Sequence, residues 1–220
     1  MAIREGLSFD ELNKLYVDEH DGNLRSMPFR QYFGEMDLSR EQKDRRIATA
    51  REMERFTRMA LISMYYLHQE GIYDYSEPAA ELAKSYKSML DRMAVPMTAF
   101  FLALHVDSMV NDMVASTVDH PDDPYYFSED RAALIAENEA NSVWNDAEYE
   151  DALLTGKTHK TWHAIMDKRV RETHAEVNGE TIPIDEPFYV GDSLLMFPRD
   201  TSLGAGAEEI ANCRCSVTYS

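Results

Sequence analysis

Cysteine is scarce in this chain of 220 residues, which contains only Cys213 and Cys215, both close to the C-terminal end. Two cysteines one residue apart cannot supply the disulfide framework of a small secreted domain, so a reducing compartment is the simpler expectation. The sequence also lacks a basic, apolar N-terminal segment with a cleavage signature, and its longest apolar candidate, MTAFFLALHV, is too short to span a bilayer. We therefore expect a protein of the cytosol, or of something assembled there, without a membrane partner.

Basic charge is in short supply as well. The 22 Lys and Arg residues are outnumbered by 40 Asp and Glu residues, which gives a formal net charge of -18 at pH 7. This balance argues against the broad basic surface on which sequence-independent DNA binding relies. The densest basic stretch, KDRRIATAREMERFTR, alternates with acids and is typical of a solvated helix face. Contact with double-stranded DNA would therefore need a local basic patch.

Two capping boxes mark the first helices. In this motif a Ser side chain accepts the backbone N–H three residues on, and the Glu or Gln found there reaches back. Ser8 with Glu11 predicts a short first helix, whereas Ser39 with Gln42 predicts a long helix over about 39–70, free of proline and glycine. The stretch between the two helices contains glycine, proline and no sustained period, which predicts an irregular connection.

Two further helical stretches follow. The pattern over about 77–117 is helical, but Pro96 interrupts it and either kinks one helix or starts a new one, which gives a helical hairpin in both cases. Ser128 can cap a helix over about 129–154, which Gly156 stops.

Five residues of the next segment fall on one stripe of a helical wheel: Trp162, Met166, Val170, Thr173 and Val177. This stripe predicts a helix over about 158–177. From Asn178 onward the sequence is rich in turns, and the final CRCSVTYS alternates like a strand. We therefore predict a mostly α N-terminal helical region, residues 1–127, followed by a small α+β C-terminal module, residues 128–220, with a short closing strand.

Polar residues line one flank of that predicted helix: His163, Asp167, Arg171 and His174. A helical rise of about 1.5 Å per residue would place His163 and His174 about 16 Å apart, too far to share one metal ion. Asp167 and Arg171, at i,i+4 spacing, would form an ion pair with His174 one turn further along. We interpret the row as an anchor that binds the turn-rich tail. The alternative is an acid–base row for phosphodiester cleavage, although no nucleophile or phosphate-binding loop accompanies it.

The closing strand leaves several interpretations of Cys213 and Cys215 to compare. Because side chains at i and i+2 share a strand face, both cysteines point to its apolar side. A disulfide between them would close a ring too short for strand geometry, and redox pairs normally use Cys-x-x-Cys at the start of a helix. Burial as small hydrophobic side chains is the favoured interpretation. Zinc is the alternative, with His174 as the third ligand and Asp167, Asp185 or another histidine as the fourth.

The C-terminal part also carries an ordered series of motifs: Arg131, Ile135, Ala136 and Glu139; Lys160, Trp162, Asp167, Arg169, Val170, Arg171 and His174; Asn178 and Gly179; Asp185, Glu186 and Phe188; Pro198 and Asp200; and Asn212, Cys213, Arg214 and Cys215. In this order they resemble the C-terminal module of the phage head morphogenesis family, the Mu F-like minor head proteins. Each motif alone is weak, whereas the combination is specific and covers residues 128–220. One departure is AENE, where the family commonly has an Arg-Thr-Glu run.

The resemblance implies a structural minor capsid protein of a tailed bacteriophage, located inside the head near the portal vertex. It would act in head assembly, DNA packaging or DNA ejection, after synthesis in the host cytoplasm. Portal protein and other head proteins are the implied partners, with packaged double-stranded DNA as a further one and no small-molecule substrate.

The resemblance supplies no catalytic residue, so we expect a protein that is not an enzyme and needs no cofactor unless the zinc alternative holds. The motif residues are expected to be structural: Trp162, Asp167, Arg169, Arg171, His174, Asn212, Cys213, Arg214 and Cys215. The alternative of a different class is a nuclease or toxin-like enzyme that uses His174, Arg171 and Asp167.

Overall fold

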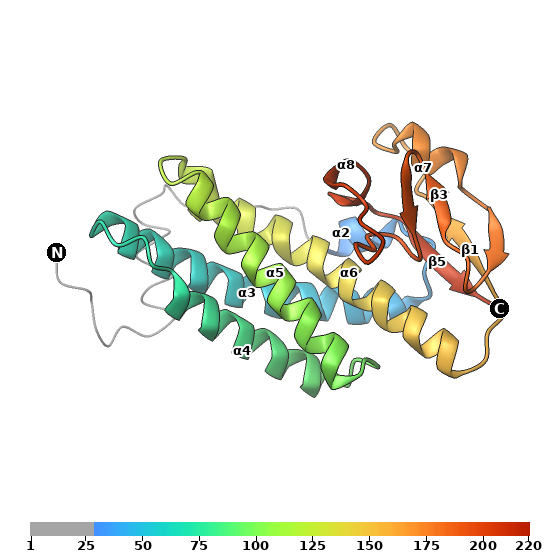
Figure 1. Ribbon diagram of the computed structural model, residues 1–220, viewed down its shortest axis with the longest axis horizontal. Helices are drawn as coiled ribbons and strands as arrows, with labels where there is room; N and C mark the ends of the chain where they lie inside the picture. The colour runs from blue at the N-terminus through green and yellow to red at the C-terminus, as the bar shows by residue number, and fades with distance from the viewer. Residues whose placement is uncertain (1–28) are drawn as a thin grey trace. The chain divides into compact units, whose positions relative to one another are not determined.

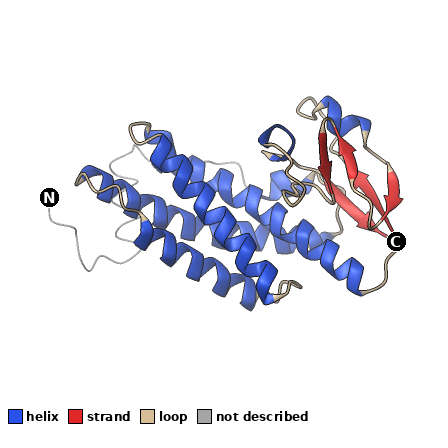
Figure 2. Ribbon diagram, in the orientation of Figure 1, coloured by secondary structure: helices blue, strands red, loops and turns tan. Residues whose placement is uncertain are grey.

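The computed structural model describes residues 29–220 (Figure 1), so the short helix predicted from Ser8 and Glu11 lies outside the described residues. The described elements are, in order, α2 (Phe29–Gly34), α3 (Arg40–Gln69), α4 (Ser76–Arg92), α5 (Ala99–Asp119), η1 (Pro124–Phe127), α6 (Glu129–Leu154), β1 (His159–His163), α7 (Glu172–Glu176), β2 (Thr181–Pro183), β3 (Phe188–Val190), β4 (Ser193–Leu195), α8 (Ala207–Ile210) and β5 (Ser216–Tyr219). All strands of this part follow α6 (Figure 2). The predicted fold class, a mostly α region followed by a small α+β module with a closing strand, is confirmed.

The chain forms two compact units, each assembled from several segments. Of the described residues, the helical unit contains Thr49–Ala94 and Ala99–Glu137, and the C-terminal unit contains Phe29–Ala48, Val95–Thr98 and Asn138–Ser220. Helices α3 and α6 contribute residues to both units. The predicted boundary before residue 128 stays a prediction.

Helix α3 begins at the capping box that the sequence predicts. The hydroxyl of Ser39 accepts the backbone N–H of Gln42 at 3.2 Å, and the side-chain oxygen of Gln42 accepts the N–H of Ser39 at 3.0 Å. Two donors that the start of a helix would otherwise leave unpaired are thereby satisfied. Part of the preceding stretch, predicted as irregular, is the short helix α2.

Pro96 separates two helices rather than kinking one. Helix α4 ends at Arg92 and α5 begins at Ala99, so the predicted stretch 77–117 is interrupted. Pro96 has no backbone N–H and disfavours helical geometry in the residue before it, and Ala94 adopts a left-handed φ of 49°. The two helices lie side by side in the helical unit (Figure 1). Within residues 29–220 no helix, α5 included, combines the length and the apolar character needed to cross a membrane.

Helix α6 has both of its predicted ends. The hydroxyl of Ser128 accepts the backbone N–H of Arg131 at 3.1 Å and so caps the first turn. Gly156, with a φ of 74°, stops the helix, as glycine commonly does in the left-handed conformation. The predicted helix over 129–154 is confirmed as Glu129–Leu154.

The predicted helix over 158–177 is wrong: strand β1 stands there, followed by residues 164–171 without regular structure and by the five-residue helix α7. The side chains of β1 alternate, with Lys160 and Trp162 buried and the others at least partly exposed. Met166, which the helical stripe grouped with Trp162, is 60% exposed. The five residues of β1 are too few for their hydrophobic pattern to distinguish a strand from a helix. Pairing with distant strands therefore determines the conformation of this segment.

Strand β1 is the middle strand of an antiparallel sheet with the order β2-β1-β5. Trp162 of β1 lies opposite Val217 of β5, which confirms the closing strand, although this strand begins only at Ser216. Strands β3 and β4 form a separate hairpin. Its turn begins with Gly191 at a φ of 59°, which a type II′ turn requires at that position.

The core of the C-terminal unit collects residues from strands, loops and the end of α7. These buried residues are Trp162, Val177, Phe188, Val190, Leu195, Cys213, Cys215 and Val217. Both cysteines therefore lie in the apolar core with Val217, as the alternation of the closing segment predicts.

Candidate functional site

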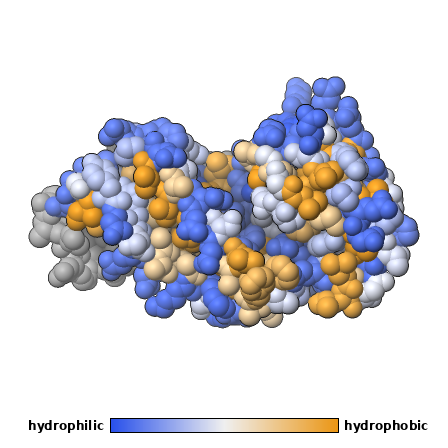
Figure 3. Space-filling view, viewed as in Figure 1, coloured by the Kyte–Doolittle hydropathy of each residue, from blue (hydrophilic) through white to orange (hydrophobic). Residues whose placement is uncertain are grey.

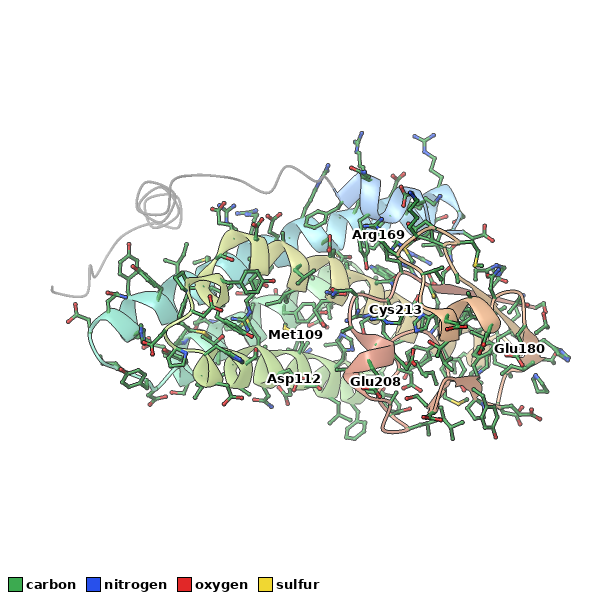
Figure 4. All side chains as sticks on the ribbon, turned by 90° about the horizontal axis from the view of Figure 1, so that it is seen from above. Met109, Asp112, Arg169, Glu180, Glu208 and Cys213 are labelled. Atoms are coloured by element: carbon green, nitrogen blue, oxygen red, sulfur yellow. The ribbon has the colours of Figure 1, made fainter. Side chains whose placement is uncertain are left out.

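Three side chains able to bind a metal ion meet inside the C-terminal unit. Nδ1 of His174 lies 3.3 Å from Sγ of Cys215 and 3.6 Å from Sγ of Cys213, and the three ligand atoms all lie within 4.8 Å of one another. The exposed fractions of His174, Cys213 and Cys215 are 2, 1 and 3%. Figure 4 shows Cys213 among the packed side chains of this unit. We call these three residues the Cys–His cluster; they are the set that the zinc alternative named.

Helix α7 supplies His174, and the chain after α8 supplies the cysteines. Asn212 adopts a left-handed φ of 54°, which Asn tolerates better than most residues, and so turns the chain toward the cluster. The side-chain amide of Asn141 on α6 donates to the carbonyl oxygens of Cys213 and Cys215 at 3.3 and 3.4 Å. These hydrogen bonds fix the backbone of both cysteines.

Glu209 of α8 binds the opposite edge of the imidazole. Its Oε2 lies 2.9 Å from Nε2 of His174 and accepts a hydrogen bond from the hydroxyl of Thr173 at 2.9 Å. Gly191 approaches this carboxylate so closely that a Cβ atom there would lie 2.7 Å from Oε1 of Glu209. Because a carboxylate accepts at Nε2, a neutral His174 carries its proton on that nitrogen and directs the lone pair of Nδ1 toward the sulfur atoms.

Charges within the Cys–His cluster stabilise one another. The hydrogen bond with Cys215 lowers the pKa of the Cys213 thiol well below its usual value, although burial opposes this change. The same hydrogen bond raises the pKa of Cys215. Burial lowers the pKa of His174, but the hydrogen bond to Cys213 and its negative charge outweigh burial and raise the pKa. A thiolate at Cys213 is therefore favoured, and the thiolate is the form that binds metals and acts as a nucleophile.

Two other motif residues border the cluster. The ring of Trp162 meets the imidazole of His174 edge to face, with the ring centroids 5.8 Å apart. Arg171 donates a hydrogen bond to the carbonyl oxygen of Ala211. Arg171 also lines a cavity of about 20 Å³ together with the three cluster residues. A cavity of this volume has room for about one water molecule.

Asp167 does not pair with Arg171, so the predicted i,i+4 ion pair is wrong, because this segment is a loop. Its Oδ1 accepts a hydrogen bond from Nη2 of Arg214 at 2.6 Å, and Oδ2 lies 3.5 Å from Nε of Arg169. The hydrogen bond from Arg214 lowers the pKa of the Asp167 carboxyl. Glu35, directly after α2, lies 3.4 and 3.6 Å from Arg214 and Arg169. The four charged residues form an ion-pair network that the solvent reaches.

The residues of the predicted polar row do not share one helix face, so the prediction is wrong. His163 lies on β1, where Nε2 is 2.8 Å from the hydroxyl of Thr218 and Nδ1 is 3.1 Å from the carboxylate of Asp37. His174 belongs to the buried cluster and Asp167 to the ion-pair network. The predicted distances between these residues were wrong because they assumed one continuous helix. The segment is instead a strand, a loop and a short helix.

Three asparagines that the motifs did not reveal bind the tail to α6. Asn138 donates to the side-chain oxygen of Asn212 at 2.9 Å, and Asn145 donates to the carbonyl of Pro198 at 3.1 Å, on either side of the contacts made by Asn141. Asparagine is uncommon inside helices, and its recurrence after three and four residues puts all three on one face. That spacing is the signal from which this row could have been predicted.

Arg46 of α3 binds the same face of α6 and is fully buried. Its guanidinium lies 2.8 and 2.9 Å from the two carboxylate oxygens of Glu148 and donates to the side chains of Asn145 at 3.0 Å and Asn141 at 3.3 Å. Burial raises the pKa of Glu148, but hydrogen bonds and charge from Arg46 and Arg45 outweigh it, so the pKa is lowered. The tail thus rests on a buried, hydrogen-bonded polar face.

Comparison with protein families decides what kind of protein this is. A family model described as Phage Mu protein F like protein matches residues 77–218. This chain belongs to that family. The match confirms the resemblance found in the C-terminal motifs, and it begins earlier than they do, so it includes α4 and α5.

Of two curated relatives of this Mu F-like protein, one is named as an enzyme and the other as an uncharacterized protein. The uncharacterized protein YqbB of Bacillus subtilis (strain 168) is 29% identical over 152 residues, which are 67% of this chain and 46% of YqbB. The NAD(+)--arginine ADP-ribosyltransferase EFV of Enterococcus faecalis (strain ATCC 700802 / V583) is 35% identical over 91 residues, 40% of this chain and 18% of EFV. The chain thus spans less than half the length of these relatives. No solved structure gives a significant match.

Proposed function

We propose that this Mu F-like protein is a minor capsid protein of a tailed bacteriophage, placed inside the head near the portal. The family match over residues 77–218 carries the proposal, because it includes residues of both compact units. The protein is made in the host cytoplasm and enters the virion during assembly, where it acts in head assembly, DNA packaging or DNA ejection. Portal protein and other head proteins are its partners, and contact with packaged double-stranded DNA is secondary because the net charge is -18.

The protein acts by contact rather than by catalysis. The nuclease alternative needs His174, Arg171 and Asp167 to face one phosphodiester, but His174 is buried and Asp167 is bound to Arg214. A cysteine nucleophile is also disfavoured, because the adjoining cavity measures about 20 Å³. Small-molecule sites occupy about 300–1,000 Å³. The activity in the name of EFV does not support an enzymatic function for this chain, because the similar residues make up only 18% of EFV.

The helical unit offers an apolar surface for a head protein. Phe100 and Leu104, one helical turn apart on α5, are 68% and 52% exposed, and Phe101 beside them is also exposed. Figure 3 shows hydrophobic residues at the surface around the start of α5. Grouped apolar side chains on a helix face are typical of helix-in-groove contacts. We assign this surface to the portal protein because it lies within the segment that matches the head protein family.

Co-purification with the portal protein of the same phage tests the proposal. After co-expression, the wild-type chain is expected to co-purify with the portal protein. The double variant Phe100→Asp, Leu104→Asp should reduce the recovered chain at least about tenfold, the effect expected when a buried apolar contact is lost at an interface. Tyr189→Asp is the matched control, since Tyr189 is an exposed aromatic residue on β3. Failure of the wild-type chain to co-purify, or equal losses in the double variant and the control, would contradict the assignment.

A further inference from the structure

We propose that His174, Cys213 and Cys215 bind one Zn²⁺ ion, with a water molecule in the adjoining cavity as the fourth ligand. The site is independent of the portal contact and would hold the C-terminal unit together. Imidazole and thiolate are the ligands that zinc prefers in proteins, whereas Mg²⁺ and Ca²⁺ prefer oxygen. Three such groups meet here from two segments that are distant in the sequence.

The distances within the Cys–His cluster fit a tetrahedral ion. With Zn–S near 2.3 Å and Zn–N near 2.05 Å, a sulfur and a nitrogen ligand lie about 3.6 Å apart and two sulfur ligands about 3.8 Å apart. Nδ1 of His174 is 3.3 Å from Cys215 Sγ and 3.6 Å from Cys213 Sγ. The three ligand atoms all lie within 4.8 Å of one another, which is about 1 Å beyond the separations of a tetrahedral site at most.

The surroundings of the cluster match those of a metal-bound histidine. Such a histidine usually donates its other ring N–H to a carboxylate, which orients the ring. Glu209 stands in that place, 2.9 Å from Nε2 of His174, and Thr173 donates a further hydrogen bond to the same oxygen. The ring of Trp162 packs edge to face against His174, with the ring centroids 5.8 Å apart.

Charge and space are also consistent with zinc. Two thiolates neutralise a divalent cation, so no additional carboxylate ligand is needed. The cavity next to Cys213 and Cys215 measures about 20 Å³ and is lined by the polar side chains of Arg171, Asn212 and Arg214. One water molecule fits in this volume, and polar neighbours can hydrogen-bond to it. Three protein ligands and one water complete a tetrahedral zinc site, an arrangement typical of catalytic zinc. Here a cavity of about 20 Å³ leaves no room for a substrate beside the ion, so the proposed role is structural.

Metal analysis of the purified full chain, prepared under reducing conditions, is the first measurement. Elemental mass spectrometry is expected to find about one zinc per chain in the wild-type protein. The variants His174→Gln and Cys213→Ser, Cys215→Ser should retain less than a tenth of that zinc. His163→Gln is the matched control, because His163 is a histidine of the same unit that binds Thr218 and Asp37 instead. Full zinc in the cysteine variant would overturn the proposal.

The variant Glu209→Gln tests whether Glu209 orients the ring of His174 without binding the metal ion itself. Removing the partner of a metal-bound histidine typically weakens affinity about 10- to 100-fold without abolishing binding. Competition with a chromogenic chelator should therefore show that weakening in Glu209→Gln, with zinc still bound stoichiometrically in the absence of chelator. Affinity equal to that of the wild-type chain would refute the assigned role of Glu209.

The wild-type chain provides a test that does not depend on the folding of variants. Addition of Co²⁺ to the metal-free, reduced protein is expected to produce thiolate-to-cobalt charge-transfer absorption that saturates at about one equivalent. Both thiols should react slowly with a thiol reagent until a chelator is added. The proposal fails if the folded wild-type chain contains no stoichiometric zinc and Co²⁺ produces no such absorption.

Discussion

The buried guanidinium of Arg46 provides the sharpest prediction about stability. Arg46→Met removes the hydrogen bonds to Glu148, Asn141 and Asn145 and leaves the Glu148 carboxylate with Arg45 and Gln42 as its remaining side-chain partners. Breaking a buried ion pair by removal of one partner costs about 3–5 kcal/mol, because the other charge remains in a poorly solvated place. We expect a loss of that size in the free energy of unfolding of the C-terminal unit.

Urea unfolding followed by tryptophan fluorescence measures this loss directly. The chain has two tryptophans, Trp144 and Trp162, and both belong to the C-terminal unit. With a urea dependence of about 1–3 kcal/mol per molar, the midpoint should fall by about 1–5 M. Arg40→Met is the control, because the ion pair of Arg40 with Asp44 lies in the same unit, is exposed and should be worth at most about 1 kcal/mol. If Arg46→Met costs no more than this control, the reasoning about the buried polar face is refuted.

Two more predictions concern the same unit. Burial lowers the pKa of Lys160 to about 8, below its ordinary 10.5, so the unfolded chain binds more protons between these values and stability rises with pH there. Lys160→Met should lose that rise in urea unfolding measured across this window; an unchanged pH profile would contradict it. Gly191→Ala should cost about 1–2 kcal/mol more than Gly204→Ala, since both glycines have a positive φ but only Gly191 has neighbours, Glu209 and Thr173, within 4 Å of the new Cβ. Equal losses would show that the close approach to Glu209 and Thr173 is unimportant.

The sequence predicts best the elements whose ends carry local signals. The capping box of Ser39 with Gln42 and the cap at Ser128 set the starts of α3 and α6 because these hydrogen bonds join residues three apart. Gly156 and Pro96 set helix ends through backbone geometry that glycine favours and proline imposes. Such signals do not depend on the rest of the fold, so they can be recognised without it.

Strand β1 could not be predicted in this way, because its conformation depends on partners far along the chain. Trp162 pairs with Val217, and only this pairing makes the segment a strand. The error then spread to Asp167 and Arg171, whose predicted ion pair assumed a helix. The zinc alternative groups His174 with the two cysteines from their ligand types alone, and the structure places the three side chains together. Zinc binding itself stays a proposal.

Composition of purified particles tests the central claim most directly. Particles that contain the portal protein but lack the major capsid protein can be isolated from infected cells and quantified by mass spectrometry. A minor capsid protein at the portal should be recovered with these particles, in few copies and in a constant ratio to the portal protein. Recovery of the chain only as a free monomer, with none in portal-containing particles, would contradict the account.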